Sequence, residues 1–497
     1  MMRISLKILL SVYILFLLTG AFTILYYPIF PSLDGPEHLF YSVTLDKLRQ
    51  GHEFYNKNLY LNDRFVPNAA FDDITIILTH FLNPIEAQKI LVFITFIALN
   101  ISFMLLLSHF TKDRSIILSI SSLFVPLTFT FVLYMGFFNF YLGLVFMILS
   151  LYLFNKAIKS KSLVDIIILG MMSFMTYYAH FFCFFLYCLI IFLSMSHDFV
   201  YFQLIKKKRF SYGQLYVFFI SSLIPVMLSL NFIIGLIARR SRGQNLPFIT
   251  DITPSFFQRI ITSFETMGYG RLNGIVTYAA IFLLLAFALY KARHAKSYKY
   301  AIVAGVLALI WLVVPTFLLN WYYFKQRFWI PVLILFLIYL TQIRFKKIER
   351  VIFIIGLLLL SSIMIYYTEV QISNEYNLIK DLYGELNHID IEGNSTVLFV
   401  YSSSSMSWHI ISYYCIEHDC LYQFTWFKEP DTFKGGYKIF MPYVNDGYNL
   451  SSWHLVFDYY FFEGSYYKNI SSVAQKFNMT KVYESDRWKV YRNESRS

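Results

Sequence analysis

The 497-residue chain is 57% hydrophobic and only 14% charged, with a mean hydropathy of +0.54. Soluble globular proteins average about 45–50% apolar and about 25% charged residues, so the excess apolar surface must face lipid. The formal net charge is +12, but the basic residues form short clusters between apolar segments. This placement indicates membrane orientation and argues against nucleic acid as a partner.

About eleven segments are apolar enough to cross a bilayer, which takes about 20 residues. The first four contain no charged residue and cover residues 8–27, 90–107, 116–133 and 141–154. The apolar stretch 163–193 is too long for one span, so we divide it into two helices around Tyr177, Tyr178 and His180. The remaining predicted spans are residues 215–237, 275–290, 300–319, 329–339 and 351–366.

Basic residues occur in every second loop between these spans. They are Arg3 and Lys7, Lys112 and Arg114, the lysines at 156, 159 and 161, and the clusters within 206–209, 291–299 and 344–350. Because Lys and Arg are retained in cytoplasmic loops, we predict a multi-pass protein of the cell membrane with a cytoplasmic N-terminus and an extracytoplasmic C-terminus. The first span ends in Tyr26-Tyr27-Pro28 without a small-residue cleavage site, so we expect it to be retained.

This topology predicts two domains. Residues 1–367 form a transmembrane domain with large external loops at 28–89 and 238–273, and residues 368–497 form an external domain. The tail alternates strand-like segments (396–401, 438–441, 455–461, 489–491) with helix-like ones (375–387, 408–415). We therefore expect a polytopic α-helical membrane protein with a small soluble α/β domain at its C-terminus.

Cys415 and Cys420 lie in the external tail. An oxidising compartment permits a short-loop disulfide between them, and a zinc site that also uses His418 is the alternative. The tail also contains five Asn-X-Ser/Thr triplets, which are either glycosylation acceptors or a product of its composition. They begin at Asn394, Asn449, Asn469, Asn478 and Asn493.

The segment that follows the first span carries two carboxylates and an imidazole, on Asp34, Glu37 and His38. A carboxylate there can accept a proton from an acceptor hydroxyl or bind a divalent cation, so these three residues are the candidate catalytic group. The structural alternative is that Asp34 caps a helix beginning at Pro36 while His38 is interfacial.

Further polar residues are candidates for substrate binding. In the first external loop they are Asn68, Asp72, Asp73 and His80, of which the two aspartates either complete a site with Asp34 or open a helix. His180 is a candidate in the divided apolar stretch, where a structural hydrogen bond is the alternative. Arg239, Arg240, Arg242 and Arg327 are external arginines, suited either to the phosphate of a lipid-linked substrate or to lipid headgroups.

Several short motifs resemble the C-type (GT-C) membrane glycosyltransferases, most closely their uncharacterised bacterial members. They are Asp34-Gly35-Pro36-Glu37-His38, Pro67-Asn68, His80 followed by Ala87-Gln88-Lys89, Gly136-Phe137-Phe138-Asn139-Phe140, Tyr178-Ala179-His180 and Gln326-Arg327-Phe328, with a similar tail around His409 and Asp458-Tyr459-Tyr460. The resemblance adds Asn139 to the candidate binding residues. The chain has no clear Asp-x-Asp pair, which leaves the use of a divalent cation open.

The resemblance implies an inverting glycosyltransferase that moves a hexosyl or pentosyl group from a polyprenyl-phosphate donor to a glycan, lipid or protein acceptor on the non-cytoplasmic face. Asp34 would take the role of the acidic loop residue, and Arg327 would contact the lipid phosphate. A transporter or flippase of a lipid-linked or polar solute is one alternative, although the sequence shows no internal repeat. A non-catalytic membrane scaffold is another.

Overall fold

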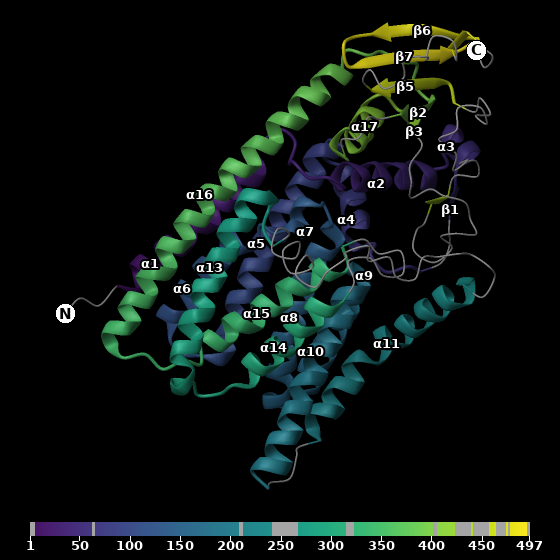
Figure 1. The fold of residues 1–497 in the computed structure, drawn as a ribbon. Helices are drawn as coiled ribbons and strands as arrows, with labels where there is room; N and C mark the ends of the chain where they lie inside the picture. Colours follow the sequence, from purple (N-terminus) through teal and green to yellow (C-terminus); the bar gives the residue numbers. More distant parts are fainter. Residues whose placement is uncertain are drawn as a thin grey trace. The chain divides into compact units, whose positions relative to one another are not determined.

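The computed structural model describes residues 5–61, 65–207, 212–240, 267–314, 323–400, 405–422, 439–440, 457–463, 474–475 and 478–494 (Figure 1). The chain divides into two compact units. The first, which we call the membrane unit, comprises Met1–Phe30, Pro67–Phe71 and Lys89–Ser373. The second, the peripheral unit, comprises Pro31–Val66, Asp72–Gln88 and Asn374–Ser497. The first external loop thus groups largely with the C-terminal tail.

Long apolar helices dominate the membrane unit. They are α1 (Leu6–Tyr26), α5 (Pro84–Phe110), α6 (Arg114–Leu127), α7 (Phe131–Tyr134), α8 (Phe138–Ser160), α9 (Leu163–Ala179), α10 (Phe181–Val200), α11 (Gly213–Arg240), α13 (Gly270–Lys291), α14 (Lys299–Val313), α15 (Trp329–Leu340) and α16 (Lys347–Leu386). Among the described residues, eight helices are long and apolar enough to span a bilayer, and α9 and α14 are shorter apolar helices. The predicted multi-span architecture is confirmed.

Each predicted span corresponds to a helix of this set, except that the span predicted at 116–133 covers both α6 and α7. The segment predicted at 300–319 extends past residue 314 beyond the described residues. The division of residues 163–193 occurs at His180, between the end of α9 and the start of α10. The Phe182 amide donates to Nδ1 of His180 at 3.1 Å, so the imidazole caps α10. This hydrogen bond satisfies one of the amides that a helix start leaves without an intrahelical partner.

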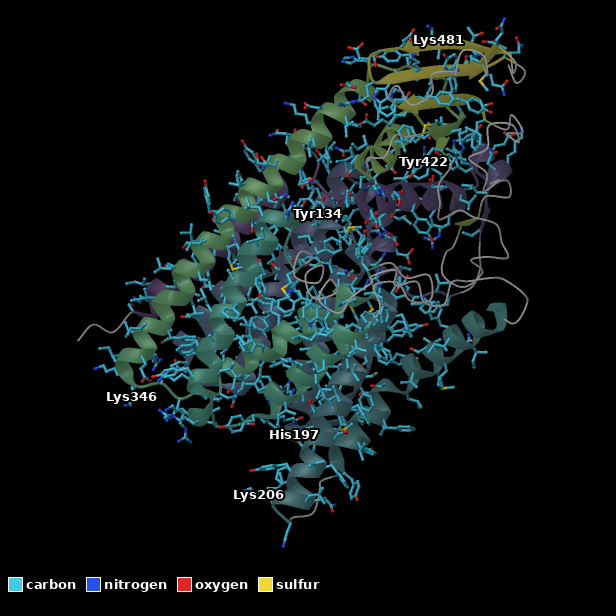
Figure 2. The ribbon with its side chains drawn as sticks, viewed as in Figure 1. Tyr134, His197, Lys206, Lys346, Tyr422 and Lys481 are labelled. Carbon is cyan, nitrogen blue, oxygen red and sulfur yellow. A yellow bond between two sulfur atoms is a disulfide. The ribbon has the colours of Figure 1, made fainter. Side chains whose placement is uncertain are left out.

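Charged residues gather at one end of the membrane unit. Figure 2 shows His197, Lys206 and Lys346 there, with Tyr134 lying towards the other end. Ion pairs connect helices at this basic end: Lys156–Asp165, Lys291–Glu349, Lys299–Asp198 and Arg350–Asp113. Basic residues from loops that were predicted to be cytoplasmic thus lie at one end of this unit.

A buried amide connects α13 with α16 inside the membrane unit. Asn273 is fully buried, and its Oδ1 accepts from the Tyr269 amide at 2.9 Å. Its Nδ2 donates to Oγ1 of Thr368 at 2.6 Å. At the next residue of α16, Glu369 accepts a hydrogen bond from Thr23 of α1. Polar side chains thus hold α1, α13 and α16 together where lipid offers no hydrogen-bond partner.

The peripheral unit combines helices with a mixed sheet. Its helices are α2 (Gly35–Arg49), α3 (Glu53–Asn58), most of α4 (Ala70–Thr79) and α17 (Ser405–Glu417). A five-stranded sheet has the order β3-β2-β5-β7-β6, formed by Leu421–Tyr422, Thr396–Val400, Tyr459–Glu463, Trp488–Asn493 and Met479–Glu484. β2 is parallel to β3 and β5, whereas β7 is antiparallel to β5 and β6. β1 (Tyr60–Leu61) pairs separately with β4 (Ile439–Phe440).

The mixed helix and strand content predicted for the tail is confirmed, with two differences. Residues 375–387 do not start a new helix, because α16 continues from the last span to Leu386. The strands β3 and β6 were not predicted. β3 has only two residues, too few for a pattern. β6 lies at the edge of the sheet and is largely exposed, so its sequence lacks the apolar alternation of a half-buried strand.

Candidate functional site

The start of α2 presents the predicted carboxylates. Asp34 is the N-cap residue, but its side chain makes no capping hydrogen bond. Glu37, in the first turn, is only 2% exposed. Nε2 of Gln88 donates to the Gly35 carbonyl at 2.6 Å and so anchors the beginning of the helix. The capping alternative for the Asp34 side chain therefore does not describe this structure.

Both carboxylates face an imidazole from the C-terminal tail. Nδ1 of His409 on α17 lies 3.1 Å from Oε1 of Glu37, and Nε2 lies 3.6 Å from Oδ1 of Asp34. Tyr422 on β3 closes this cluster, because its ring packs on Phe40 of α2 with a centroid separation of 4.9 Å. The Tyr422 hydroxyl lies 2.7 Å from Oγ of Ser412, one turn beyond His409 on α17. We call Asp34, Glu37 and His409 the acid–imidazole cluster.

The charges of this cluster act on its neighbours. Burial alone would lower the pKa of His409, but the carboxylate of Glu37, aided by that of Asp34, raises it above the ordinary histidine value. Burial raises the pKa of Tyr422 well above its usual value, and the negative charge of Glu37 adds to the effect. Tyr422 therefore stays a neutral phenol at physiological pH, whereas His409 is favoured in its charged form.

One donor atom from each cluster residue lies within 4.8 Å of the others, which is the arrangement in which three side chains can hold a metal ion. A metal would take one nitrogen of the imidazole together with the carboxylate oxygens. In the structure the two ring nitrogens face different carboxylates. The geometry is accordingly that of a histidine placed between two carboxylates.

A disulfide and two contacts of Asp419 connect the end of α17 to β3, α2 and α3. A disulfide between Cys415 and Cys420, with an S–S distance of 2.02 Å, connects the end of α17 to the start of β3. Inside the disulfide loop, Asp419 pairs with Lys47 of α2 and accepts from the Tyr55 hydroxyl at 3.0 Å. Because both sulfurs are engaged in the disulfide, Cys415 and Cys420 do not form the alternative zinc site with His418.

His38 is not part of the acid–imidazole cluster and contacts a separate carboxylate, that of Asp72. Its Nδ1 lies 3.4 Å from Oδ1 of Asp72, which is 4% exposed. Oγ of Ser42 also approaches Asp72, at 3.4 Å. The structure thus brings Asp34 and Glu37 together around His409, and it pairs His38 with Asp72 separately.

The other acidic-loop candidates lie in surface ion pairs. Asp73 pairs with Arg49 at 3.1 Å, and His80 lies 3.9 Å from Asp46. Asp72 and Asp73 both occupy the first turn of α4, where negative charge favours the helix start.

In the membrane unit, the predicted Arg327 is buried. It lies on the short 3₁₀ helix η3 (Lys325–Phe328) and is 8% exposed. Its guanidinium lies over the rings of Phe137 and Phe140, at 4.7 and 5.7 Å, and Nη1 lies 3.5 Å from Nε2 of His180. Lys325, two residues earlier on η3, is only 3% exposed. Two cationic side chains at one buried turn make this segment a candidate anion-binding site.

Both asparagine candidates bind backbone. Oδ1 of Asn68, a residue with a positive φ of 63°, accepts from the Phe181 amide at 2.9 Å. Oδ1 of Asn139 accepts from the Phe71 amide at 2.8 Å. These bonds fasten Pro67–Phe71 to α8 and α10, so both side chains serve the fold of the membrane unit.

The predicted arginines at the end of α11 fall largely outside the described residues. The α11 backbone reaches Arg240, whereas the side chains of Arg239 and Arg240, and all of Arg242, lie outside the described residues.

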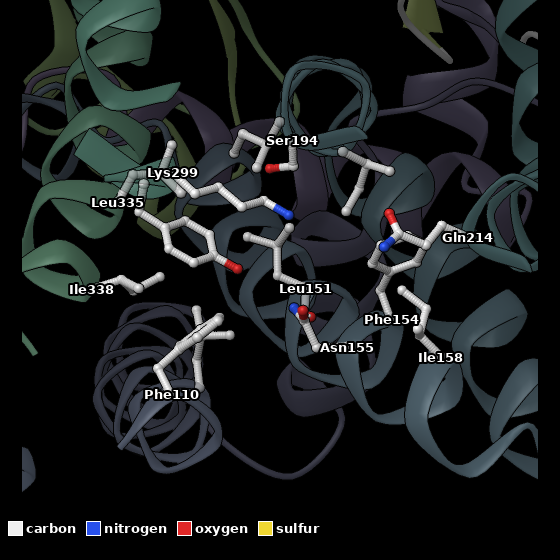
Figure 3. Close-up of a pocket in the computed structure, with 14 residues that line it drawn as sticks. Phe110, Leu151, Phe154, Asn155, Ile158, Ser194, Gln214, Lys299, Leu335 and Ile338 are labelled. Carbon is white, nitrogen blue, oxygen red and sulfur yellow. The ribbon is translucent and has the colours of Figure 1, made fainter. Parts of the chain in front are cut away.

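A small cavity of about 40 Å³ opens near the basic end of the membrane unit (Figure 3). Its lining mixes apolar side chains with polar groups of Asn155, Ser194, Gln214 and Lys299. A water molecule needs about 10–15 Å³ of such space, so the cavity suits a few waters around the Lys299–Asp198 pair rather than a lipid headgroup.

Sequence reasoning missed the roles of His409, Tyr422 and Lys325. His409 lies 375 residues after Asp34, so no local spacing connects the two. The sequence signals were the helix predicted at 408–415, which carries His409, the family resemblance around His409, and the position of Lys325 two residues before Arg327.

Two solved structures share this fold over nearly the whole chain. ArnT from Cupriavidus metallidurans bound to undecaprenyl phosphate has a TM-score of 0.58 and 10% identity, covering 98% of this chain and 97% of ArnT. ArnT in the apo state has a TM-score of 0.54 and 12% identity, with coverages of 97% and 98%. No protein-family model and no curated protein matches the sequence. The likeness shows an ArnT-like fold, in agreement with the multi-span architecture and mixed C-terminal sheet that the sequence predicted.

Proposed function

From the ArnT-like fold we propose that this protein is a membrane glycosyltransferase that uses a polyprenyl-phosphate-linked sugar donor. The observation that carries the proposal is the buried cationic turn at Lys325 and Arg327 in the membrane unit. The chain shares its fold with ArnT, which was solved with undecaprenyl phosphate, a lipid phosphate of this class. A cation placed where little water reaches is costly, and an anionic ligand offsets that cost.

Arg327 is suited to hold the phosphate. Its planar guanidinium can bind two phosphate oxygens at once, and the ring of Phe137 on one side restrains its orientation. Positive charge there stabilises the negative charge that develops on the lipid phosphate as the sugar departs.

Asp34 is the proposed base. Glu37 is nearly fully buried, whereas Asp34 retains partial exposure at the helix start and can reach an acceptor hydroxyl. In a single displacement, Asp34 takes the acceptor proton while the acceptor oxygen bonds to the anomeric carbon and the lipid phosphate leaves, which inverts the configuration. The acceptor is a glycan, lipid or protein.

The basic residues at one end of the membrane unit support an orientation with the N-terminus in the cytoplasm and the peripheral unit outside. The Cys415–Cys420 disulfide supports the same assignment, because disulfides persist in oxidising compartments.

Binding of undecaprenyl phosphate to the purified full-length protein tests the role of Arg327. We expect Arg327→Gln to weaken binding about 10- to 100-fold, because a charge-assisted hydrogen bond contributes about 1.5–3 kcal/mol. Arg327→Lys keeps the positive charge but loses the planar guanidinium. Its affinity should therefore lie between those of the wild type and of Arg327→Gln. Arg350→Gln, which removes a cation at the basic end of the membrane unit, is the matched control. Equal affinity of Arg327→Gln and the wild type would rule out this phosphate site.

A further inference from the structure

Two loops at the basic end of the membrane unit are joined by a short antiparallel bridge between Ala295 and Ile343. The Lys296 amide donates to the Gln342 carbonyl at 2.9 Å. One loop connects α13 with α14, and the other connects α15 with α16. The bridge therefore makes one surface out of two loops that are separated in the sequence by three helical segments of this unit.

The bridge orients the side chains around it. In extended backbone, successive side chains point to opposite sides. Ile343 is only 4% exposed, whereas the next residue, Arg344, is exposed and points away from the protein interior. Lys296, next to the bridging Ala295, is exposed as well. The Arg344 amide donates to the His294 carbonyl at 3.1 Å, so the two loops are held in register around these cations.

Further exposed cations flank the bridge. One precedes it in the first loop, and two follow it in the second loop, where Figure 2 shows Lys346. Together with the two cations beside the bridge, they form a surface that we call the basic platform. Its members are Arg293, Lys296, Arg344, Lys346 and Lys347.

Carboxylates at the same end of the membrane unit are paired with other cations. Glu349 pairs with Lys291 at 2.7 Å, and Asp113 pairs with Arg350. Within the parts of the chain that the structure describes, none of the five platform cations forms an ion pair with a carboxylate. Like charges gathered on one surface repel one another, so an anion from outside the protein would stabilise this arrangement.

The side chains around the platform suit the surface of a bilayer. Tyr290 and Tyr298 are 70% and 47% exposed, and Ile348 is 56% exposed. Tyrosine rings favour the level of the lipid headgroups, and an exposed isoleucine is more stable against lipid than in water. Cations beside such residues, at the ends of apolar helices, lie at the level of the lipid phosphates.

We propose that the basic platform binds the headgroups of anionic phospholipids in the leaflet at the basic end of the membrane unit. Guanidinium and ammonium groups donate charge-assisted hydrogen bonds to phosphate oxygens. Because the bridge holds both loops in one surface, a single headgroup can contact cations from each loop. Binding here is independent of the sugar transfer proposed above.

Binding of labelled phosphatidylglycerol to the purified full-length protein in a neutral detergent tests this site. We expect unlabelled phosphatidylglycerol to compete for it, and phosphatidylcholine and inorganic phosphate to compete far less. Each cation near an anionic headgroup strengthens binding about fivefold, so Arg344→Gln/Lys346→Gln should weaken it about 10- to 30-fold. Lys159→Gln/Lys161→Gln is the matched control, because it removes two exposed cations at the end of α8 and should bind like the wild type.

Salt tests the same site without any substitution. Raising the ionic strength from about 0.15 to 1 M shortens the screening length from about 8 to 3 Å, so binding to the wild type should weaken. Equal losses in the two double variants would overturn the site, because net charge alone would then attract the lipid. Equal competition by phosphatidylcholine, or by inorganic phosphate, would overturn the assignment to anionic lipid headgroups.

Discussion

Single buried polar residues determine how the helices of the membrane unit are joined. Asn273 accepts from one helix start and donates to α16 across the interface, whereas Asn100 on α5 donates only to Phe96 of its own helix, at 2.9 Å. In lipid, a hydrogen bond between helices contributes about 0.6–2 kcal/mol, because the separated helices find few other partners.

We expect Asn273→Ala to destabilise the protein by about 1–2 kcal/mol, since it leaves the Tyr269 amide and the Thr368 hydroxyl without this partner. Asn100→Ala is the matched control and should cost less, because its side chain joins no second helix. Thermal unfolding in detergent, followed by intrinsic fluorescence, compares the two midpoints. Equal midpoints would show that the amide bridge between α13 and α16 contributes nothing.

The sequence identified some site residues and not others for a physical reason. Asp34 and Glu37 stand three residues apart after a predicted span, so their proximity follows from the helix between them. His409 reaches them only through the fold of the peripheral unit. Asn68 was a binding candidate as a polar residue of the first external loop, and Asn139 was added by the family resemblance. In the structure both accept backbone hydrogen bonds, which a sequence alone does not show.

Among the elements, α2 and α17 matter most for the candidate site. Each presents part of the acid–imidazole cluster, and the Lys47–Asp419 pair fixes their other ends. The Cys415–Cys420 disulfide closes a short loop around Asp419. Closing a loop of that size lowers the conformational entropy of the unfolded chain, which stabilises the folded state by about 2 kcal/mol.

We expect the double variant Cys415→Ser/Cys420→Ser to destabilise the peripheral unit by about that amount. Cleavage of the tail by a protease at increasing urea concentration measures the effect, because cleavage requires local unfolding. Cys188→Ser, which alters an unpaired cysteine of α10 in the membrane unit, is the control. Identical urea midpoints for the double variant and the wild type would contradict a stabilising role of the disulfide.

Helices were easier to predict than strands. The spans followed from apolar length alone, and the break at His180 followed from a run too long for one bilayer crossing. The edge strand β6 lacked an apolar pattern, and the continuity of α16 past the last span was hidden because its final turns are polar. Pattern reasoning detects burial, so it fails where an element is exposed.

At the scale of the whole molecule, the fold matches that of ArnT over nearly the full length of the chain. The two sequences are only 10–12% identical. Two features connect this fold to a function: the buried cations of η3 in the membrane unit and the acid–imidazole cluster in the peripheral unit. The first suits a lipid phosphate, and the second suits the activation of a hydroxyl. The grouping of the first external loop with the tail could not be read from the sequence, because it depends on contacts between segments more than 300 residues apart.

The most direct test is transfer of labelled sugar from a mixed pool of polyprenyl-phosphate donors, using purified wild-type protein beside Asp34→Asn and a range of acceptors. We expect transfer by the wild type and a loss of at least about 100-fold in Asp34→Asn, the size expected when a general base is removed. Transfer that survives in Asp34→Asn would move the base to another carboxylate, with Glu37 the first choice. Absence of transfer by the wild type from every donor and acceptor would contradict the proposed glycosyltransferase.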